Sequence, residues 1–405
     1  MTLVSFSQEG TSSPYSFYGI GDIKFSGTLE NRSMGGISVS QDSTRLNLQN
    51  PAGYANLKLT VFTIGGGNNY TKLKSSSESA KAQKTTFDYL AIGLPLGKKF
   101  GGAFGLIPYS SVGYRIANVN PDPLQSSKRF NGWGGLNRVF LGFGYTVIPN
   151  LNIGVNGYYN FGKIQSNSLE YIQEYTVGTR ELNVNNLSGL NVNLGMTYKT
   201  KINKKMSLFS SLYYTPESTL KSENTRNIAT VTYNSTFDLQ VIEATADETS
   251  KTDFKLPQKW TFGAGVGDSK KWLVGGEVSF QDAGTFANNY NTINNVSYEK
   301  SQKYSLGGFY LPNSNSFSSY AKRITYRGGF KYEKTGLVMN SASINDMSLS
   351  LGVSLPITES FSSFNVGLEL GKKGTTSHNL VQENYFSLNL SFTLNDRWFV
   401  KSKFF

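Results

Sequence analysis

The stretch MSLSLGVSL, residues Met347–Leu355, decides the fold. Its odd-numbered positions hold Met, Leu, Leu, Val and Leu, whereas its even-numbered positions hold only serine and glycine. Because successive side chains of a β-strand point to opposite faces, an extended chain here has one apolar face and one small, polar face. The pattern therefore predicts a strand with Leu351 on the apolar face and Ser350 on the other.

The same alternation returns along most of the chain. Leu90, Ile92, Leu94 and Leu96 share one face of FDYLAIGLPL, and large apolar residues alternate mainly with Gly, Asn or Thr in VFLGFGYTV, LNIGVNGYYNF and LNVNLGMTY; these four stretches begin at residues 87, 139, 151 and 190. A soluble β-sandwich also alternates. The repeated choice of small polar partners, however, is typical of a transmembrane β-barrel, in which one face meets lipid and the other faces the lumen.

The connections between these stretches differ in length. Short, often basic breaks occur near Gly97, Pro149, Asn203, Ser269 and Thr358, and longer polar segments lie between them. Short turns at one end and long loops at the other are characteristic of outer-membrane barrels. The sequence thus predicts an all-β fold, a transmembrane antiparallel barrel of about fourteen strands.

Composition agrees with this class. The chain has 405 residues, of which 38% are hydrophobic and 14% aromatic, and it contains 42 glycines. No apolar run approaches the roughly 20 residues that a membrane helix needs. The net charge of +12 is spread over turns beside the strands, so we expect contact with outer-membrane lipid and lipopolysaccharide and not with nucleic acid.

Enzymatic chemistry is not expected. The chain has no cysteine and a single histidine, His378, in a loop-like stretch, which excludes thiolate metal sites and the usual nucleophilic triads. We therefore expect no catalytic residues, no metal and no cofactor. Two carboxylates on the lumen face, Glu277 and Glu369, are expected to form ion pairs with Arg32 or Arg45 instead of a catalytic dyad.

The N-terminal region is of a different kind. Residues 1–7 resemble the end of a secretory signal, and residues 8–57 alternate poorly. Within them, Asn50-Pro51-Ala52-Gly53 predicts a short helix capped by Asn50, because asparagine accepts hydrogen bonds from free amides and proline suits the first helical position. This helix is either an ordinary helical turn or part of a plug inside the barrel of residues 58–405.

Pro108 breaks the pattern in GGAFGLIPYSSVGYRI, which begins at Gly101. Proline removes a ladder hydrogen bond and is normally confined to strand edges or bulges. Since a closed barrel has no edge, Pro108 predicts a bulge or kink in the third strand.

Two segments resemble the FadL-like family of outer-membrane transporters for long-chain fatty acids and other hydrophobic compounds, and a third resembles other outer-membrane proteins. The segment with Met34-Gly35-Gly36, Asp42 and Asn50-Pro51-Ala52-Gly53 is similar to the hatch of that family. The stretch that begins LPQKWTFGAGVG at Leu256 is similar to a central strand pair, and the ending LNDRWFVKSKFF resembles outer-membrane proteins of the Bacteroidetes type. The hatch motif also occurs in related barrels that serve protein secretion.

The resemblance implies a Gram-negative outer-membrane channel for passive uptake of fatty acids or aromatic hydrocarbons. Cargo would leave sideways at an inward kink of the third strand, marked by Pro108 and lined by Phe104, Leu106, Ile107 and Tyr109. The alternative is a structural or accessory barrel within a larger outer-membrane complex for protein secretion or assembly, with other outer-membrane proteins as partners. A continuous apolar tunnel would favour the first function, and a packed lumen would favour the second.

Overall fold

The computed structural model describes residues 10–398, except for 235, 269, 283–294, 315–318 and 358–361. The possible signal remnant at residues 1–7, the turn positions Ser269 and Thr358, and the chain end from residue 399 lie outside the described residues. The division into a plug of residues 8–57 and a barrel of residues 58–405 stays a prediction. We call residues 10–57 the hatch segment.

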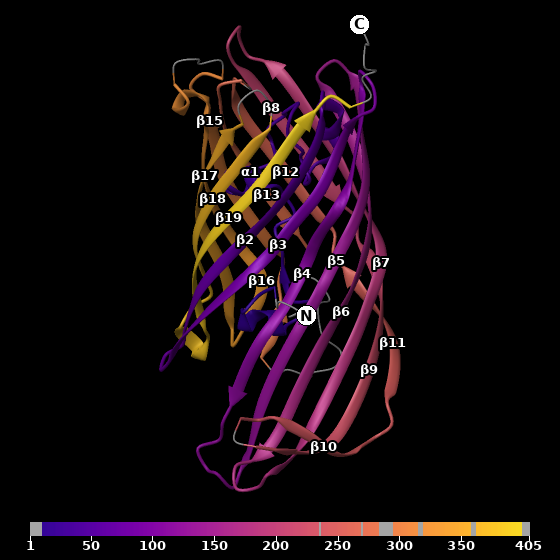
Figure 1. The fold of residues 1–405 in the computed structure, drawn as a ribbon, viewed down its shortest axis with the longest axis vertical. Helices are drawn as coiled ribbons and strands as arrows, with labels where there is room; N and C mark the ends of the chain where they lie inside the picture. Colours follow the sequence, from indigo (N-terminus) through magenta and orange to yellow (C-terminus); the bar gives the residue numbers. More distant parts are fainter. Residues whose placement is uncertain are drawn as a thin grey trace, which may run out of the picture.

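The described strands form one closed antiparallel barrel (Figure 1). The ring closes where β19 pairs with β2, from Gln382↔Lys74 to Asp396↔Thr60. β8 and β9 follow one another along the same line of the wall, as do β10, β11 and β12, and also β14 and β15. The described residues thus make a wall of fourteen strands, as the sequence predicts.

The first half of the wall consists of β2 (Thr60–Lys74), β3 (Ser79–Pro95), β4 (Phe100–Asn118), β5 (Ser126–Ile148), β6 (Leu151–Ile172), β7 (Val177–Lys201), β8 (Ser207–Thr215) and β9 (Ser218–Tyr233). The second half consists of β10 (Leu239–Ala244), β11 (Glu248–Leu256), β12 (Lys259–Asp268), β13 (Trp272–Gln281), β14 (Val296–Tyr298), β15 (Ser301–Tyr310), β16 (Thr325–Met339), β17 (Ala342–Pro356), β18 (Ser363–Lys373) and β19 (Gln382–Asp396). Two short 3₁₀ helices, η3 (Ala321–Arg323) and η4 (Ser377–Asn379), lie in connections.

The hatch segment lies inside this wall, where Figure 1 shows it in indigo. It contains four short elements: η1 (Pro14–Phe17), β1 (Asp22–Ile23), α1 (Leu29–Arg32) and η2 (Pro51–Asn56). Within the described ranges, no helix combines the length and apolar character needed to cross a membrane.

The two faces of the wall divide as the alternation predicts. Leu351 is 55% exposed on the outer surface, whereas Ser350 is only 2% exposed and faces the hatch segment. Large apolar side chains cover the outer surface of most strands, including Leu141, Leu190, Leu194, Val274, Leu306, Leu349 and Leu370. Apolar side chains exposed on so many strands of a closed barrel, with small polar residues on the inner face, are the pattern of a lipid-facing surface, so this outer surface is the membrane-facing one.

The wall is much taller on one side. β5, β6 and β7 have 23, 22 and 25 residues, whereas β13 and β15 have 10 each. A membrane strand needs about 9–11 residues, so roughly half of each long strand projects beyond the bilayer. Figure 1 shows this projection below the rest of the barrel, with β10 at its tip. It has its own small core, in which Leu169, Tyr171 and Val231 pack with Phe237.

A charge placed on either face of β17 tests the face assignment. Leu351→Arg should impair assembly, because an arginine on the lipid face costs about 2–4 kcal/mol near the bilayer midplane. Ser348→Arg is the matched control, since Ser348 lines an internal cavity and its hydroxyl bonds the Glu369 carboxylate at 2.7 Å. Ser350 is unsuitable because its hydroxyl accepts a hydrogen bond from the Gly35 amide at 3.0 Å.

The yield of heat-modifiable barrel in outer-membrane fractions measures the effect. Equal losses for Leu351→Arg and Ser348→Arg would contradict the assignment of the two faces.

Candidate functional site: the hatch, its seat and the β3–β4 seam

The helix η2 begins as the sequence predicts. The Asn50 side chain accepts a hydrogen bond from the Ala52 amide at 3.1 Å, and Pro51 occupies the first helical position. The segment is a 3₁₀ helix and ends with a bond from the Leu57 amide to the Tyr54 carbonyl at 3.2 Å. It is buried and packs against β3 to β7, so the segment lies against the inner wall.

Glycines of the wall form the seat of η2. A Cβ atom on Gly154 would lie 2.4 Å from the Ala52 backbone nitrogen, which is closer than any real contact of that kind. Gly101, Gly144 and Gly195 meet the backbone or cap of η2 in the same way. The small residues on this lumen face therefore allow the hatch backbone to approach the wall backbone directly.

Asparagines of the same strands hold the hatch by hydrogen bonds. Asn193 donates to the Gln49 carbonyl at 2.9 Å, and Asn152 donates to the Asn56 side-chain oxygen at 3.1 Å. In return, the Asn50 amide group donates to the Met196 carbonyl at 3.2 Å. These asparagines look like ordinary lumen residues in the sequence, and only the fold places them beside their hatch partners.

Apolar contacts fill the lumen at several levels. Four hatch residues, Leu46, Leu48, Tyr54 and Leu57, share a buried cluster with Ile107 and Phe140. Separate clusters join Met34, Ile37 and Val39 to Phe209 and Leu273, and Ile20 to Leu136, Leu187, Leu220 and Leu256. The hatch segment is thus anchored along most of its length.

The predicted pairing of Glu277 and Glu369 with hatch arginines is wrong. Glu277 accepts hydrogen bonds from the Ser38 amide at 2.9 Å and the Tyr213 hydroxyl at 2.7 Å, while Glu369 accepts one from the Ser348 hydroxyl. Arg32 instead pairs with Asp88 at 3.3 Å and Arg45 with Asp42 at 3.2 Å. Arg45 thus pairs with a carboxylate of its own turn, whereas Arg32 pairs with one that the fold brings from β3.

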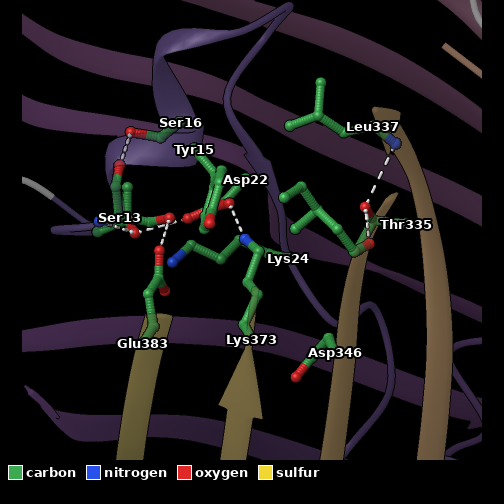
Figure 2. Close-up of polar contacts among 12 residues, drawn as sticks. Ser13, Tyr15, Ser16, Asp22, Lys24, Thr335, Leu337, Asp346, Lys373 and Glu383 are labelled. Carbon is green, nitrogen blue, oxygen red and sulfur yellow. Dashed lines mark hydrogen bonds and ion pairs between the residues drawn. The ribbon is translucent and has the colours of Figure 1, made fainter. Parts of the chain in front are cut away.

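A polar latch joins the start of the hatch segment to β18 and β19. We define the latch as Ser13, Tyr15 and Asp22 of the hatch with Lys373 and Glu383 of the wall, which converge in Figure 2. Lys373 donates to Asp22 at 2.6 Å, and the Ser13 hydroxyl donates to the Glu383 carboxylate. Burial opposes ionisation of Asp22, but the nearby Lys373 ammonium outweighs it and holds the pKa of Asp22 below its ordinary value.

A cavity of about 480 Å³ remains between the hatch segment and the wall. Its lining includes Tyr109, Arg138 and Lys303, and also Lys331 with Glu369, which lie 3.7 Å apart. Charged groups therefore share this lining with apolar side chains such as Phe25 and Leu256.

The wall itself is interrupted between β3 and β4. Their ladder runs from Pro95↔Gly101 to Leu90↔Leu106 and then stops, although both strands continue. Register shifts next to this point leave Asp88 as an extra residue in β3 and Tyr109 as an extra residue in β4. We call this interval, Thr85–Tyr89 of β3 facing Ile107–Tyr114 of β4, the seam.

The hatch segment borders the seam on both sides. Its short strand β1 pairs with β4 at Asp22↔Ser111 and Ile23↔Ser110, and the Lys24 amide donates to the Tyr109 carbonyl at 2.9 Å. On the β3 side, Arg32 binds Asp88, and the Leu29 amide donates to the Tyr89 hydroxyl at 3.0 Å. The hatch therefore contacts both strands where they stop contacting each other.

The predicted residues of the third strand divide between the two faces of the wall. A bulge follows Pro108 in the ladder with β5, as the sequence predicts. Phe104 is exposed outside, Leu106 forms the last rung with β3, Ile107 is buried against the hatch, and Tyr109 lies inside with its ring 3.8 Å from the Arg138 guanidinium. They do not line one common channel, and the side opening stays a prediction.

Comparison with solved structures identifies the fold. The fold matches the Pseudomonas putida toluene transporter TodX with a TM-score of 0.60 and 14% identity, over 94% of this chain and 100% of that chain. A Pseudomonas aeruginosa FadL homologue matches with a TM-score of 0.60 and 9% identity over the same shares. The chain thus has the fold of FadL-type outer-membrane channels and is an outer-membrane β-barrel.

The family follows from the sequence as a whole. The BamG family model matches residues 1–405, and the chain belongs to the BamG family. A search of curated proteins finds no match. At the low identities above, the likeness to the channels concerns the fold alone.

A methyl group in the seat tests how tightly the wall holds η2. Gly154→Ala should displace the helix and cost about 1–3 kcal/mol, the usual penalty for overpacking. Gly157→Ala on the same strand is the control, because a Cβ there has no neighbour nearer than 3.8 Å. Limited proteolysis should cleave the hatch segment faster in Gly154→Ala only, and equal rates in both variants would contradict the seat.

Removing the Lys373 ammonium group tests how much the latch stabilises the folded barrel. Lys373→Met leaves Asp22 buried without its partner, which should destabilise the folded barrel by about 3–5 kcal/mol. Lys128→Met is the control, since the Lys128–Glu170 pair is half exposed and such pairs contribute about 0–1 kcal/mol. Unfolding in urea in detergent measures both changes. A Lys373→Met barrel as stable as the Lys128→Met barrel would show that the latch is dispensable.

Proposed function

We propose that the protein is a non-enzymatic, plugged barrel that serves as a structural or accessory subunit of a larger outer-membrane complex for protein secretion or assembly. The observation that carries this proposal is the hatch segment fixed inside the lumen. The hatch segment is fixed to the wall by the glycine seat, by asparagine hydrogen bonds and by three buried apolar clusters. A barrel whose interior is occupied in this way is better suited to present its surfaces to other proteins than to conduct solutes.

The remaining cavity also argues against a lumen route for oily molecules. Apolar and charged side chains are mixed in its lining, and where the lining is charged, at Arg138, Lys303 and Lys331, an apolar molecule gains none of the roughly 25 cal/mol per Å² that burial against apolar surface provides.

The tall side of the wall supports a role in binding other proteins. Roughly half of β5, β6 and β7 projects beyond the length that spans a bilayer. This projection has its own core around Tyr171 and Phe237, which keeps it rigid outside the membrane. A rigid surface of this kind serves contact with protein or lipopolysaccharide and is not needed for a pore.

Native purification tests this function. The tagged protein is extracted from outer membranes in mild detergent, and a second tagged barrel of similar abundance serves as control. We expect outer-membrane partners to co-migrate with this chain in constant ratio through size exclusion and to be absent from the control. A chain that migrates alone at the mass of one barrel would contradict the proposal.

Passage of hydrophobic small molecules is the second candidate, and the seam is the observation that favours it. The β3–β4 ladder ends at Leu90↔Leu106, beside the bulge that follows Pro108. The fold is shared with a protein described as a toluene transporter. Fatty acids or aromatic hydrocarbons would enter from the outer side and leave through the seam into the bilayer.

Uptake by whole cells tests this second candidate. Pro108→Val restores a backbone N–H beside the seam and should lower uptake of a radiolabelled fatty acid or aromatic hydrocarbon. Pro95→Val is the control, because Pro95 lies in the closed part of the β3–β4 ladder. At matched surface levels, equal uptake in all three proteins would contradict lateral passage.

A further inference from the structure

The seam leaves one strand edge of the wall without a described neighbour. Residues Thr85–Tyr89 of β3 pair with β2 on one side, and no strand among the described residues pairs with them on the other. The opposite edge, on β4, is covered at Ser110 and Ser111 by the two residues of β1. The hatch thus extends the sheet from β4 but does not reach the backbone of β3.

An edge without a strand partner among the described residues can accept a partner strand. Backbone N–H and C=O groups that face lipid cost several kcal/mol each when they lack hydrogen bonds. Open edges are also templates to which other strands add. The hatch shows that the seam accepts such an addition, because β1 joins β4 in antiparallel register and Lys24 bonds the Tyr109 carbonyl at 2.9 Å.

The two rims of the seam define the chemistry of an added strand. On the outside, Phe87 of β3 is 43% exposed, so outward residues of the strand would meet an aromatic ring and lipid. On the inside, Asp88 is neutralised by Arg32 at 3.3 Å, and Ser110 and Ser111 are buried. Inward residues must therefore be small or polar. This alternation is the pattern of a transmembrane barrel strand.

We propose that Thr85–Tyr89 of β3 is a β-augmentation site that binds an extended strand of a partner outer-membrane barrel protein. Main-chain hydrogen bonds supply the binding, and the apolar outer rim with the polar inner rim selects an alternating strand. This proposal rests on the proposed function and names the site and the kind of segment that the complex uses.

Photocrosslinking at Phe87 tests the site. A benzophenone amino acid replaces Phe87 in the full chain, in cells that make the protein at its normal level. Phe386→benzophenone amino acid is the matched control, because Phe386 is a similarly exposed aromatic on β19, which is paired on both sides. Mass spectrometry of the adducts should identify an alternating strand of an outer-membrane protein at position 87 and no protein adduct at position 386.

A disulfide between β1 and β4 distinguishes binding of the partner strand at β3 from binding at β4. The pair Ile23→Cys and Ser110→Cys, which are direct antiparallel partners, locks β1 onto β4. Because the partner strand uses β3, the adduct at position 87 should persist in the locked protein. Loss of the adduct on locking would overturn the proposal, since the partner would then occupy the place of β1.

Three further results would overturn it: adducts with lipid alone, adducts with a helix or a soluble domain, or adducts with another segment of this same chain. Failure of the proposed binding site can be distinguished from failure of the proposed function. A complex that purifies intact without a position-87 adduct refutes the site alone, whereas a chain that purifies alone refutes both.

Discussion

The structure depends on one constraint: inside a bilayer, every backbone N–H and C=O group must find a hydrogen-bond partner within the protein. Closure of β19 onto β2 meets this constraint for almost the whole wall. Among the described residues the exception is the seam, where the β3–β4 ladder ends at Leu90↔Leu106. The hatch segment responds at that point by adding β1 to β4 and an ion pair to Asp88 of β3.

This arrangement gives the hatch two roles that reinforce each other. Its apolar residues fill the lumen, and its first part completes the wall beside the seam. The glycine seat under η2 and the latch at Lys373 fix it at two well-separated places. Displacing the hatch would therefore expose both the lumen and a strand edge, which explains why a plugged barrel keeps so many polar contacts with its plug.

The sequence predicts the wall well and the interior poorly, for a physical reason. Alternation is local, so the faces of Leu351 and Ser350 follow from their neighbours, and the cap at Asn50 and the bulge after Pro108 follow from the preferences of single residues. The bulge at Asp88 has no such local signal. The partner of Arg32 and the seat at Gly154 depend on contacts between segments far apart in the chain, and no local pattern encodes them.

Hydrogen exchange of the hatch strand is the most direct measurement of the central claim, that the hatch is a fixed part of the wall. The Lys24 amide, bonded to the Tyr109 carbonyl, should exchange as slowly in detergent as the amides of the β4–β5 ladder beside it. Exchange as fast as that of the exposed loop at Asp122 would contradict the account and make β1 a loosely held segment.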